Sequence, residues 1–331
     1  MHKLKRAMLF LLALALLTTA LCGCSDKKYQ EVIGTCADHD VLYEELRYVT
    51  LSYKDMFEST YGEGIWDTPE SAEQYREELE NVVWDMMLNN YAVLAACSYY
   101  MDQSSINDDT IDKAVNAQVE ETINELGGKS AFQRSLEELY MTEHFLRFCL
   151  RVAQLENELL YVLSDDLGLI EDDLDEFMAW LEDGNVRYVQ HVYIGNDPGD
   201  NKEENRATAE DIRRQLLEGA DIGTFIGSSV NEDMQNVAPY FMVRDVYVEE
   251  MESAAFDLNS VGDVSKVVDA GTGYYVMVLM EYSNATLLLQ AEDLLNSYQW
   301  AKVEQLVGTF RPKIAMELND YGKSIDLLTI K

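Results

Sequence analysis

The chain has 331 residues, with 61 acidic against 25 basic side chains and a formal net charge of −36 at pH 7. This excess of acidic side chains excludes nucleic-acid binding, which needs clustered Lys and Arg, and it disfavours adhesion to anionic lipid headgroups. Hydrophobic residues make up 47% of the chain, which is ordinary for globular proteins, and the length predicts two folding units.

The N-terminal residues have the pattern of an export signal. The cations Lys3, Lys5 and Arg6 precede an uncharged apolar run over residues 7–21. Because this run is shorter than the roughly 20 residues that span a bilayer, we expect a cleaved signal peptide over residues 1–23. Its removal leaves 22 basic against 61 acidic residues, a formal charge of −39.

The end of this segment suggests a lipid anchor. Leu21-Cys22-Gly23-Cys24 resembles the lipobox of bacterial lipoproteins, in which the last cysteine is acylated and becomes the N-terminus. The resemblance implies that Cys24 is lipidated and holds the mature chain on the outer face of a bacterial cell membrane. An ordinary signal peptide that ends near a cysteine is the alternative.

The remaining cysteines do not form a disulfide framework. Cys36, Cys97 and Cys149 are an odd and sparse set for an exported protein. No His/Cys/Asp cluster has metal-ligand spacing, and no glycine-rich phosphate loop is present. We therefore expect neither a metal nor a cofactor.

Residues 24–185 are predicted to form an all-helical region. From Glu77 to Glu182 the apolar residues recur at steps of three and four, which is the helical period. The first stripe runs from Val83 to Cys97 and the second from Ile111 to Leu126. A third continuous stripe is formed by Phe132, Leu136, Leu139, Leu146, Val152, Leu155, Leu159 and Val162, and a short fourth one by Leu174, Phe177, Met178 and Leu181.

At residue 186 the period changes, and residues 186–283 are predicted to form an α+β domain with a four-stranded sheet. The expected order is strand 186–194, polar loop 195–205, helix 206–218, strand 239–243, helix 249–256, and a hairpin of strands 264–269 and 274–282. Residues 284–331 return to helix over 284–328. Since neither flanking region has a self-sufficient apolar face, we expect the C-terminal segment to pack on the N-terminal region.

Five stretches of the α+β segment resemble one family in their order and separation. They are Val186–Ile194 (VRYVQHVYI), Leu217–Asp221 (LEGAD), Glu252–Leu258 (ESAAFDL), Val261–Ser265 (VGDVS) and Gly273–Met277 (GYYVM). Residues 186–283 resemble a parvulin-type peptidyl-prolyl isomerase domain. The whole chain resembles the PrsA/SurA group of exported foldases, in which a helical chaperone region brackets such a domain.

The resemblance implies a set of catalytic residues. His191 matches the first histidine of the family and Asp233 the position of an acid or cysteine. Thr272 matches a hydroxyl position near the second histidine, which is itself replaced by Tyr275. From the residues alone, the alternative for His191 is a structural strand histidine, and the alternative for Asp233 is a turn residue.

The resemblance also implies a slot for a proline ring. Tyr247, Val248 and Met251 fall at the slot positions of the family, and Phe256 follows in the same helix. These residues are the expected substrate-binding side chains.

Two functions are compatible with this pattern. The first is an extracytoplasmic peptidyl-prolyl cis-trans isomerase that assists the folding of newly exported, unfolded polypeptides. The second is a lipid-anchored chaperone whose parvulin-like domain binds peptide without turnover, and the replacement of a family histidine by Tyr275 favours it. A solute- or wall-binding lipoprotein is a more distant third class.

Overall fold

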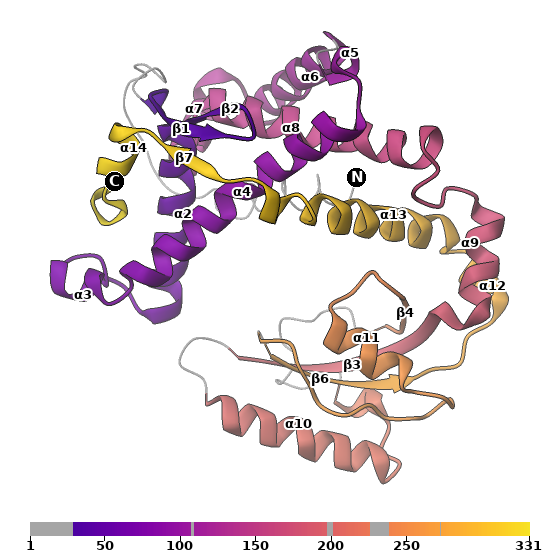
Figure 1. Ribbon diagram of the computed structural model, residues 1–331. Coiled ribbons are helices and arrows are strands. Elements are labelled where there is room, and N and C mark those ends of the chain that lie inside the picture. The colour runs from indigo at the N-terminus through magenta and orange to yellow at the C-terminus, as the bar shows by residue number, and fades with distance from the viewer. Residues whose placement is uncertain (1–28, 107–108, 197–200, 226–237, 272) are drawn as a thin grey trace. The chain divides into compact units, whose positions relative to one another are not determined.

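The computed structural model describes residues 29–106, 109–196, 201–225, 238–271 and 273–331 (Figure 1). The chain divides into two compact units. The first contains the chain up to Val162 together with Leu306–Lys331, and the second contains Leu163–Gln305. Among the described residues, no helix is both long enough and apolar enough to cross a membrane.

The first unit is mainly helical. Its helices are α2 (Tyr43–Tyr61), α3 (Pro69–Glu73), α4 (Arg76–Tyr100), α5 (Gln103–Ile106), α6 (Asp109–Glu125), α7 (Lys129–Glu138), α8 (Glu143–Tyr161) and α14 (Asp320–Ser324). Helix α4 packs against α2 and α8, and α6 packs against α7 and α8. The fold buries most of the two predicted apolar stripes, while Met86 of the first stripe is 39% exposed.

The third helix expected from the sequence is two helices, α7 and α8. Thr142 caps α8, because its side-chain oxygen accepts a hydrogen bond from the backbone N–H of Phe145. Just before it, Tyr140 has a φ of 58°, in the left-handed region where a right-handed helix cannot continue. Because the apolar residues keep the helical spacing across this break, the sequence pattern predicted one continuous helix.

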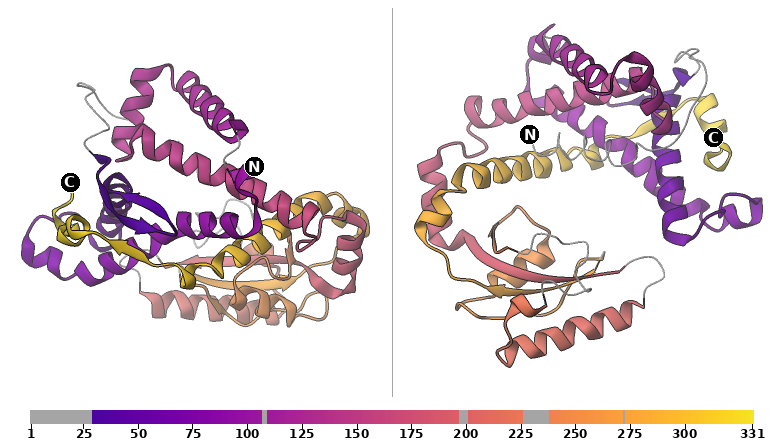
Figure 2. Two further views of the ribbon diagram at one scale, coloured as in Figure 1. Left: turned by 45° about the horizontal axis from the view of Figure 1, so that its top comes forward. Right: turned by 180° about the vertical axis from the view of Figure 1, so that it is seen from behind.

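The first unit also holds a three-stranded antiparallel sheet that the sequence did not reveal. Its strands are β1 (Val32–Cys36), β2 (His39–Leu42) and β7 (Met316–Leu318), in the order β2-β1-β7. The expectations of an all-helical first region and of helix throughout 284–328 are wrong at these strands. Figure 2 shows β7, in yellow, beside β1, in indigo, although the two come from opposite ends of the chain. Strands of three to five residues are too short for periodicity to identify.

The last residues of the chain complete this first unit. Lys54 Nζ donates hydrogen bonds to the carbonyl oxygens of Leu328 and Ile330, both at 2.9 Å. Residues 306–331 thus pack with the N-terminal region, whereas 284–305 belong to the second unit.

The second unit confirms the predicted α+β class. Its strands are β3 (Val186–Gly195), β4 (Tyr240–Val243), β5 (Val268–Asp269) and β6 (Gly273–Leu279), which form one antiparallel sheet in the order β4-β3-β6-β5. Its helices are α9 (Leu174–Trp180), α10 (Lys202–Leu217), α11 (Glu249–Phe256), α12 (Asn284–Leu288) and α13 (Ala291–Gly308), the last of which continues into the first unit.

Helices cover both faces of this sheet (Figure 1). Helix α10 packs on one face, against Val192 and Ile194 of β3 and Val276 of β6. Helix α11 packs on the other face, against Val189 of β3 and Met277 of β6. Because side chains alternate between the two faces along a strand, the odd-numbered residues of β3 point to the α11 side.

Helix α10 begins earlier than predicted. The sequence suggested a polar loop over 195–205 and a helix from Arg206, but Asn201 caps the helix. Its side-chain oxygen accepts hydrogen bonds from the backbone N–H groups of Glu203 and Glu204 at 3.2 and 3.4 Å. A capping asparagine followed by two acidic residues in the first turn is a helix start signal, and it outweighs the polar composition.

The second unit extends beyond residues 186–283 on both sides, because three flanking helices share a core with β4. Phe177 of α9, Leu287 of α12 and Leu295 of α13 belong to one buried cluster with Phe241. The domain limits drawn from the sequence stay a prediction.

Candidate functional site

The face of the sheet on the α11 side carries an aromatic cluster around His191. His191 lies on β3, between Tyr240 on the neighbouring β4 and Tyr275 on the neighbouring β6. Strand pairing sets Val189 opposite Tyr240, and Tyr193 opposite Tyr275. Because these pairs share the odd-numbered face of β3, the rings of all three strands meet there.

His191 is buried, with 8% of its surface exposed, and among the described residues one of its two ring nitrogens has a partner. Nδ1 lies 3.1 Å from the hydroxyl oxygen of Tyr240. Within the described part of the chain, Nε2 is buried without a hydrogen-bond partner. Burial lowers the pKa of His191 to about 4, so the imidazole is neutral at pH 7. A neutral imidazole has one donor and one acceptor nitrogen, so Nε2 keeps an unused hydrogen-bonding position in either tautomer.

Tyr240 is the member of this cluster that the sequence did not reveal. Its ring meets that of His191 edge-on, with the centroids 5.4 Å apart. Burial, and then the neighbouring Tyr247 and Tyr275, raises the pKa of its hydroxyl, which therefore stays protonated. The predicted strand 239–243 contains this residue, but only its pairing with β3 shows that its side chain shares the face of His191.

Tyr275 lies on the other side of the imidazole. Its ring centroid is 5.2 Å from that of His191 and 4.7 Å from that of Tyr193. Burial and the nearby Tyr193 raise its pKa. A Cβ at Gly273 would come within 2.5 Å of the Ile194 carbonyl oxygen and of the Tyr193 ring, so glycine is needed where the strands bring these rings together. The structure thus places together the two residues matched to the histidine pair of the family, while their catalytic roles stay predictions.

Two of the four predicted slot residues reach this cluster. Met251 is 7% exposed and packs in the core of the same face, and the ring of Tyr247 lies 6.2 Å from that of Tyr240. Val248 is 58% exposed at the start of α11. Phe256 packs against the same core from the opposite end of α11 and, among the described residues, makes no ring contact with the tyrosines. The structure therefore does not bring these two into the cluster.

Three further predicted residues lie outside the described residues. They are Asp233 and Thr272 of the expected catalytic set and Cys24, the expected lipidation site. Their roles stay predictions.

No metal-binding group is present in the part of the chain that the structure describes. No three His, Cys, Asp or Glu side chains there are placed to hold an ion. Cys36, Cys97 and Cys149 are free thiols.

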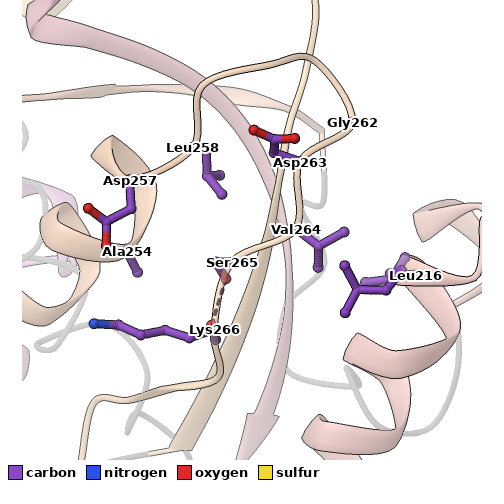
Figure 3. A pocket seen from close by; sticks show the side chains of 10 residues that line it. Leu216, Ala254, Asp257, Leu258, Gly262, Asp263, Val264, Ser265 and Lys266 are labelled. Atoms are coloured by element: carbon purple, nitrogen blue, oxygen red, sulfur yellow. Dashed lines mark hydrogen bonds between the residues drawn. The ribbon is translucent and has the colours of Figure 1, made fainter.

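A separate hollow of about 350 Å³ lies between the C-terminal ends of α10 and α11 (Figure 3). Leu216 of α10 and Ala254 of α11 contribute apolar walls, and Asp257, Asp263 and Lys266 contribute charges of both signs. None of the predicted site residues lines this hollow. It is thus distinct from the His191 cluster.

Comparisons with known proteins find solved structures of foldases and SurA-like chaperones that are similar to the chain. No family model and no curated protein sequence matches the chain. Among solved structures, it is similar to foldase protein PrsA from Streptococcus pneumoniae, with 18% identity over 73% of this chain and 86% of that one and a TM-score of 0.37.

Two other solved structures extend this similarity. The peptidylprolyl isomerase PrsA of Bacillus anthracis is 13% identical over 69% of this chain and 96% of its own, with a TM-score of 0.37. A SurA-like chaperone of Campylobacter jejuni is 11% identical over 87% of this chain and 99% of its own, with a TM-score of 0.29. At these values the similarity assigns no activity, and the functional argument rests on the residues of the site.

Proposed function

We propose that the chain is an exported foldase whose second unit catalyses the cis-trans isomerisation of X-Pro peptide bonds. The observation that carries this proposal is the unused Nε2 of a buried, neutral His191 on an apolar, tyrosine-lined face. The resemblance of residues 186–283 to parvulin-type domains supports the choice of reaction.

The reaction is a rotation about the amide C–N bond, and no bond breaks. Its barrier of about 18–20 kcal/mol comes from the partial double-bond character of the amide, and X-Pro bonds exchange in tens to hundreds of seconds without a catalyst. At the twisted transition state this resonance is lost, so the amide nitrogen regains a lone pair and the carbonyl oxygen loses negative charge. Groups that stabilise the twisted amide more than the planar forms therefore accelerate the rotation.

His191 is suited to such differential stabilisation. In the tautomer whose Nδ1 accepts the proton of the Tyr240 hydroxyl, Nε2 carries a proton and has no acceptor among the described residues. That N–H can donate to the amide nitrogen only when the amide twists. Because the site is buried, this hydrogen bond is stronger than the same contact in water.

The neighbouring aromatic and thioether groups can hold the proline ring. Tyr240 and Tyr275 flank His191, Tyr247 is 40% exposed beside Tyr240, and Met251 forms part of the apolar floor. Aromatic rings bind the pyrrolidine ring through apolar contact while their hydroxyls remain solvated or hydrogen-bonded.

A binding module without turnover is the second candidate. It is favoured by the tyrosines on both sides of His191, which leave only 8% of that residue exposed. A client proline would then bind to the exposed tyrosine surface without reaching Nε2.

The two candidates differ in a rate measurement. We would measure cis-trans exchange of a short Ala-Pro peptide by NMR with the chain 24–331, and compare it with the His191→Ala variant and with a His39→Ala control at a histidine of the first unit. Acceleration by the wild type and by the control, but not by His191→Ala, is the expected result. Equal, uncatalysed exchange in all three, with aggregation of an unfolded protein still suppressed, would leave only the chaperone function.

The cellular location of the protein is part of the same proposal. We infer that acylated Cys24 tethers the chain to the outer face of a bacterial cell membrane and that the helical first unit holds unfolded exported polypeptides. The wild type expressed with its signal should carry a lipid by mass spectrometry and fractionate with membranes. A Cys24→Ser variant that stays equally membrane-bound would refute the anchor.

A further inference from the structure

Two arginines lie over the ring of Phe256, at the C-terminal end of α11. The guanidinium carbon of Arg244 lies 3.9 Å from the centroid of the Phe256 ring, and that of Arg187 lies 4.9 Å from the same centroid. The two cations are therefore no more than about 9 Å apart. Phe256 was an expected slot residue, and the structure surrounds it with positive charge instead.

Neither arginine forms an ion pair with the described residues, although the protein has 61 acidic side chains. Asp245 follows Arg244 directly, yet its carboxylate pairs with Lys302 Nζ at 2.7 Å. By contrast, Arg214 on α10 pairs with two carboxylates at 2.6 and 2.9 Å. Since no carboxylate of the described residues pairs with these two neighbouring arginines, they form a local site for an external anion.

Arg187 is held in place by backbone groups. Its Nε donates to the Leu258 carbonyl oxygen at 3.2 Å, and its Nη1 donates to the carbonyl oxygens of Gly184 and Val186 at 3.1 and 2.9 Å. Burial, and then the charge of Arg244, lowers the pKa of Arg187, which shows that the two cations repel each other. A bound anion would remove this repulsion.

Arg244 is exposed, and its contact with Phe256 leaves the edges of the guanidinium free. The aromatic ring restricts the plane of the guanidinium, so less conformational freedom is lost when an anion binds. The fork of N–H groups matches the geometry of a carboxylate, which it can bind through two parallel hydrogen bonds.

We propose that Arg244, with Arg187 beside it, forms a carboxylate-binding subsite that recognises an acidic residue of the polypeptide bound at the second unit. This rests on the proposed function, since it assigns a sequence preference to the same client. Arg187 and His191 lie on the same face of β3, four residues apart. At about 3.3 Å per residue their Cα atoms are about 13 Å apart, which corresponds to a carboxylate about four extended residues from the proline.

The test compares uncharged-end peptides that contain one Ala-Pro bond and a single Glu or Gln three to five residues from it. Their affinity for the chain 24–331 is measured by isothermal titration calorimetry at low and at high salt. We expect the Glu peptide to bind about three- to five-fold more tightly than its Gln twin, and this preference to shrink with salt. Equal affinities for the twins would overturn the subsite.

Matched variants separate the subsite from the overall charge. Arg244→Gln should abolish the Glu preference, and Arg244→Lys should restore only part of it, because a lysine lacks the planar fork. Arg214→Gln removes the same charge from α10, on the opposite face of the sheet, and should leave the preference for the Glu peptide unchanged. If Arg214→Gln lowers the preference as much as Arg244→Gln does, only the net charge acts and the subsite is refuted.

An acetate titration distinguishes this proposal from the proposed function. If neither peptide binds, the polypeptide-binding function fails. Shifts of the Arg244 and Arg187 Nε–Hε NMR signals with acetate, and none at Arg214, would still support an anion site. No shift at Arg244 with acetate would overturn it, whether or not the peptides bind.

Discussion

Two buried polar clusters, one in each unit, differ in how completely their hydrogen bonds are satisfied. In the first unit, Glu44 is 2% exposed. One of its carboxylate oxygens accepts a hydrogen bond from the Thr142 hydroxyl at 2.6 Å, and the other contacts Nδ1 of His144. In the second unit, the described residues give His191 a partner for one ring nitrogen only.

The residue next to Glu44 completes the satisfied cluster. Glu45 accepts a hydrogen bond from the Leu42 backbone N–H at 2.9 Å and one from the Tyr91 hydroxyl at 2.8 Å. All four carboxylate oxygens of the pair thus have partners, which is what a structural cluster requires. From this difference we infer that the Glu44–Glu45 cluster stabilises the packing of helices, whereas Nε2 of His191 is available to form a hydrogen bond with a ligand.

The largest expected effect is in the satisfied cluster. Glu44→Ala leaves the buried Thr142 hydroxyl without its acceptor and removes the carboxylate that contacts His144 at the start of α8, so it should lower the free energy of unfolding of the first unit by about 3–4 kcal/mol. Urea denaturation with a fluorescence readout measures this loss. The exposed Glu120→Ala control should stay within about 0.5 kcal/mol of wild type. A loss of similar size in both variants would show that the cluster has no special structural role.

The next largest effect is the pH dependence of the free energy of unfolding of the first unit. Burial raises the pKa of Glu45 from 4.5 to about 7, against the hydrogen bonds from Leu42 and Tyr91. A carboxyl with a raised folded-state pKa contributes stability fully below pH 4.5 and loses it as pH rises through 7, in total about 3 kcal/mol. Glu45→Gln should remove this dependence, which urea unfolding at pH 4.5 and 7.5 would detect. An unchanged difference between the two pH values would contradict it.

The second unit should respond to pH with the opposite sign. His191 has its pKa lowered from 6.5 to about 4 by burial, so its contribution is fully present above pH 6.5 and is lost as pH falls through 4. The loss is again about 3 kcal/mol. Hydrogen exchange of peptides from β3 and β6, compared between wild type and His191→Gln at pH 4 and 7, measures it. Wild-type protection that falls no further than that of the variant at pH 4 would show that His191 titrates normally.

A smaller effect is expected on the rate of X-Pro exchange at the His191 cluster. Tyr275→His restores the second histidine of the family pattern, and one further hydrogen bond to the twisted amide is worth about 1.4 kcal/mol, or a tenfold faster X-Pro exchange. Tyr275→Phe removes only the hydroxyl and serves as the control. If Tyr275→His exchanges no faster than wild type, the tyrosine is not what limits turnover, and the binding-only function gains support.

The smallest effect concerns the buried hydroxyl of Thr50 in the first unit, for which we propose no ligand. Thr50 is fully buried in α2, and its hydroxyl has no hydrogen-bond partner among the described residues. Thr50→Val replaces the hydroxyl by a methyl group of similar size, so it should stabilise the first unit by up to about 1 kcal/mol. The midpoint of urea unfolding should rise with an unchanged slope. A clear destabilisation would mean that the hydroxyl has a partner in solution.

Much of the second unit could be predicted because its strands are β-branched runs bounded by turn residues. The strand starting at Val186 and the helix 249–256 lie where the sequence placed them. His191 and Tyr275 were identified by their match to the two histidine positions of the resembled family. Tyr240 was not, because a residue on β4 becomes a neighbour of His191 only through the register in which β4 pairs with β3.

The first unit was predicted less completely, for a related reason. Its helices follow the local spacing of apolar residues, which the sequence displays directly. The strand β7 has three residues and gains its hydrogen bonds from β1 at the other end of the chain. No local pattern encodes such a pairing, because it depends on contacts that exist only after the chain has folded.

The sequence by itself determined the export signal pattern, the acidic charge, the helical stripes and the order of strands and helices in the α+β unit, because each of these is a local property of consecutive residues. Only the tertiary structure decided which polar atoms have partners. Glu44, Glu45 and His191 are alike in the sequence as single titratable residues within ordinary elements. Their surroundings come from distant segments, and within the described part of the chain those surroundings satisfy the two carboxylates while leaving one imidazole nitrogen without a partner.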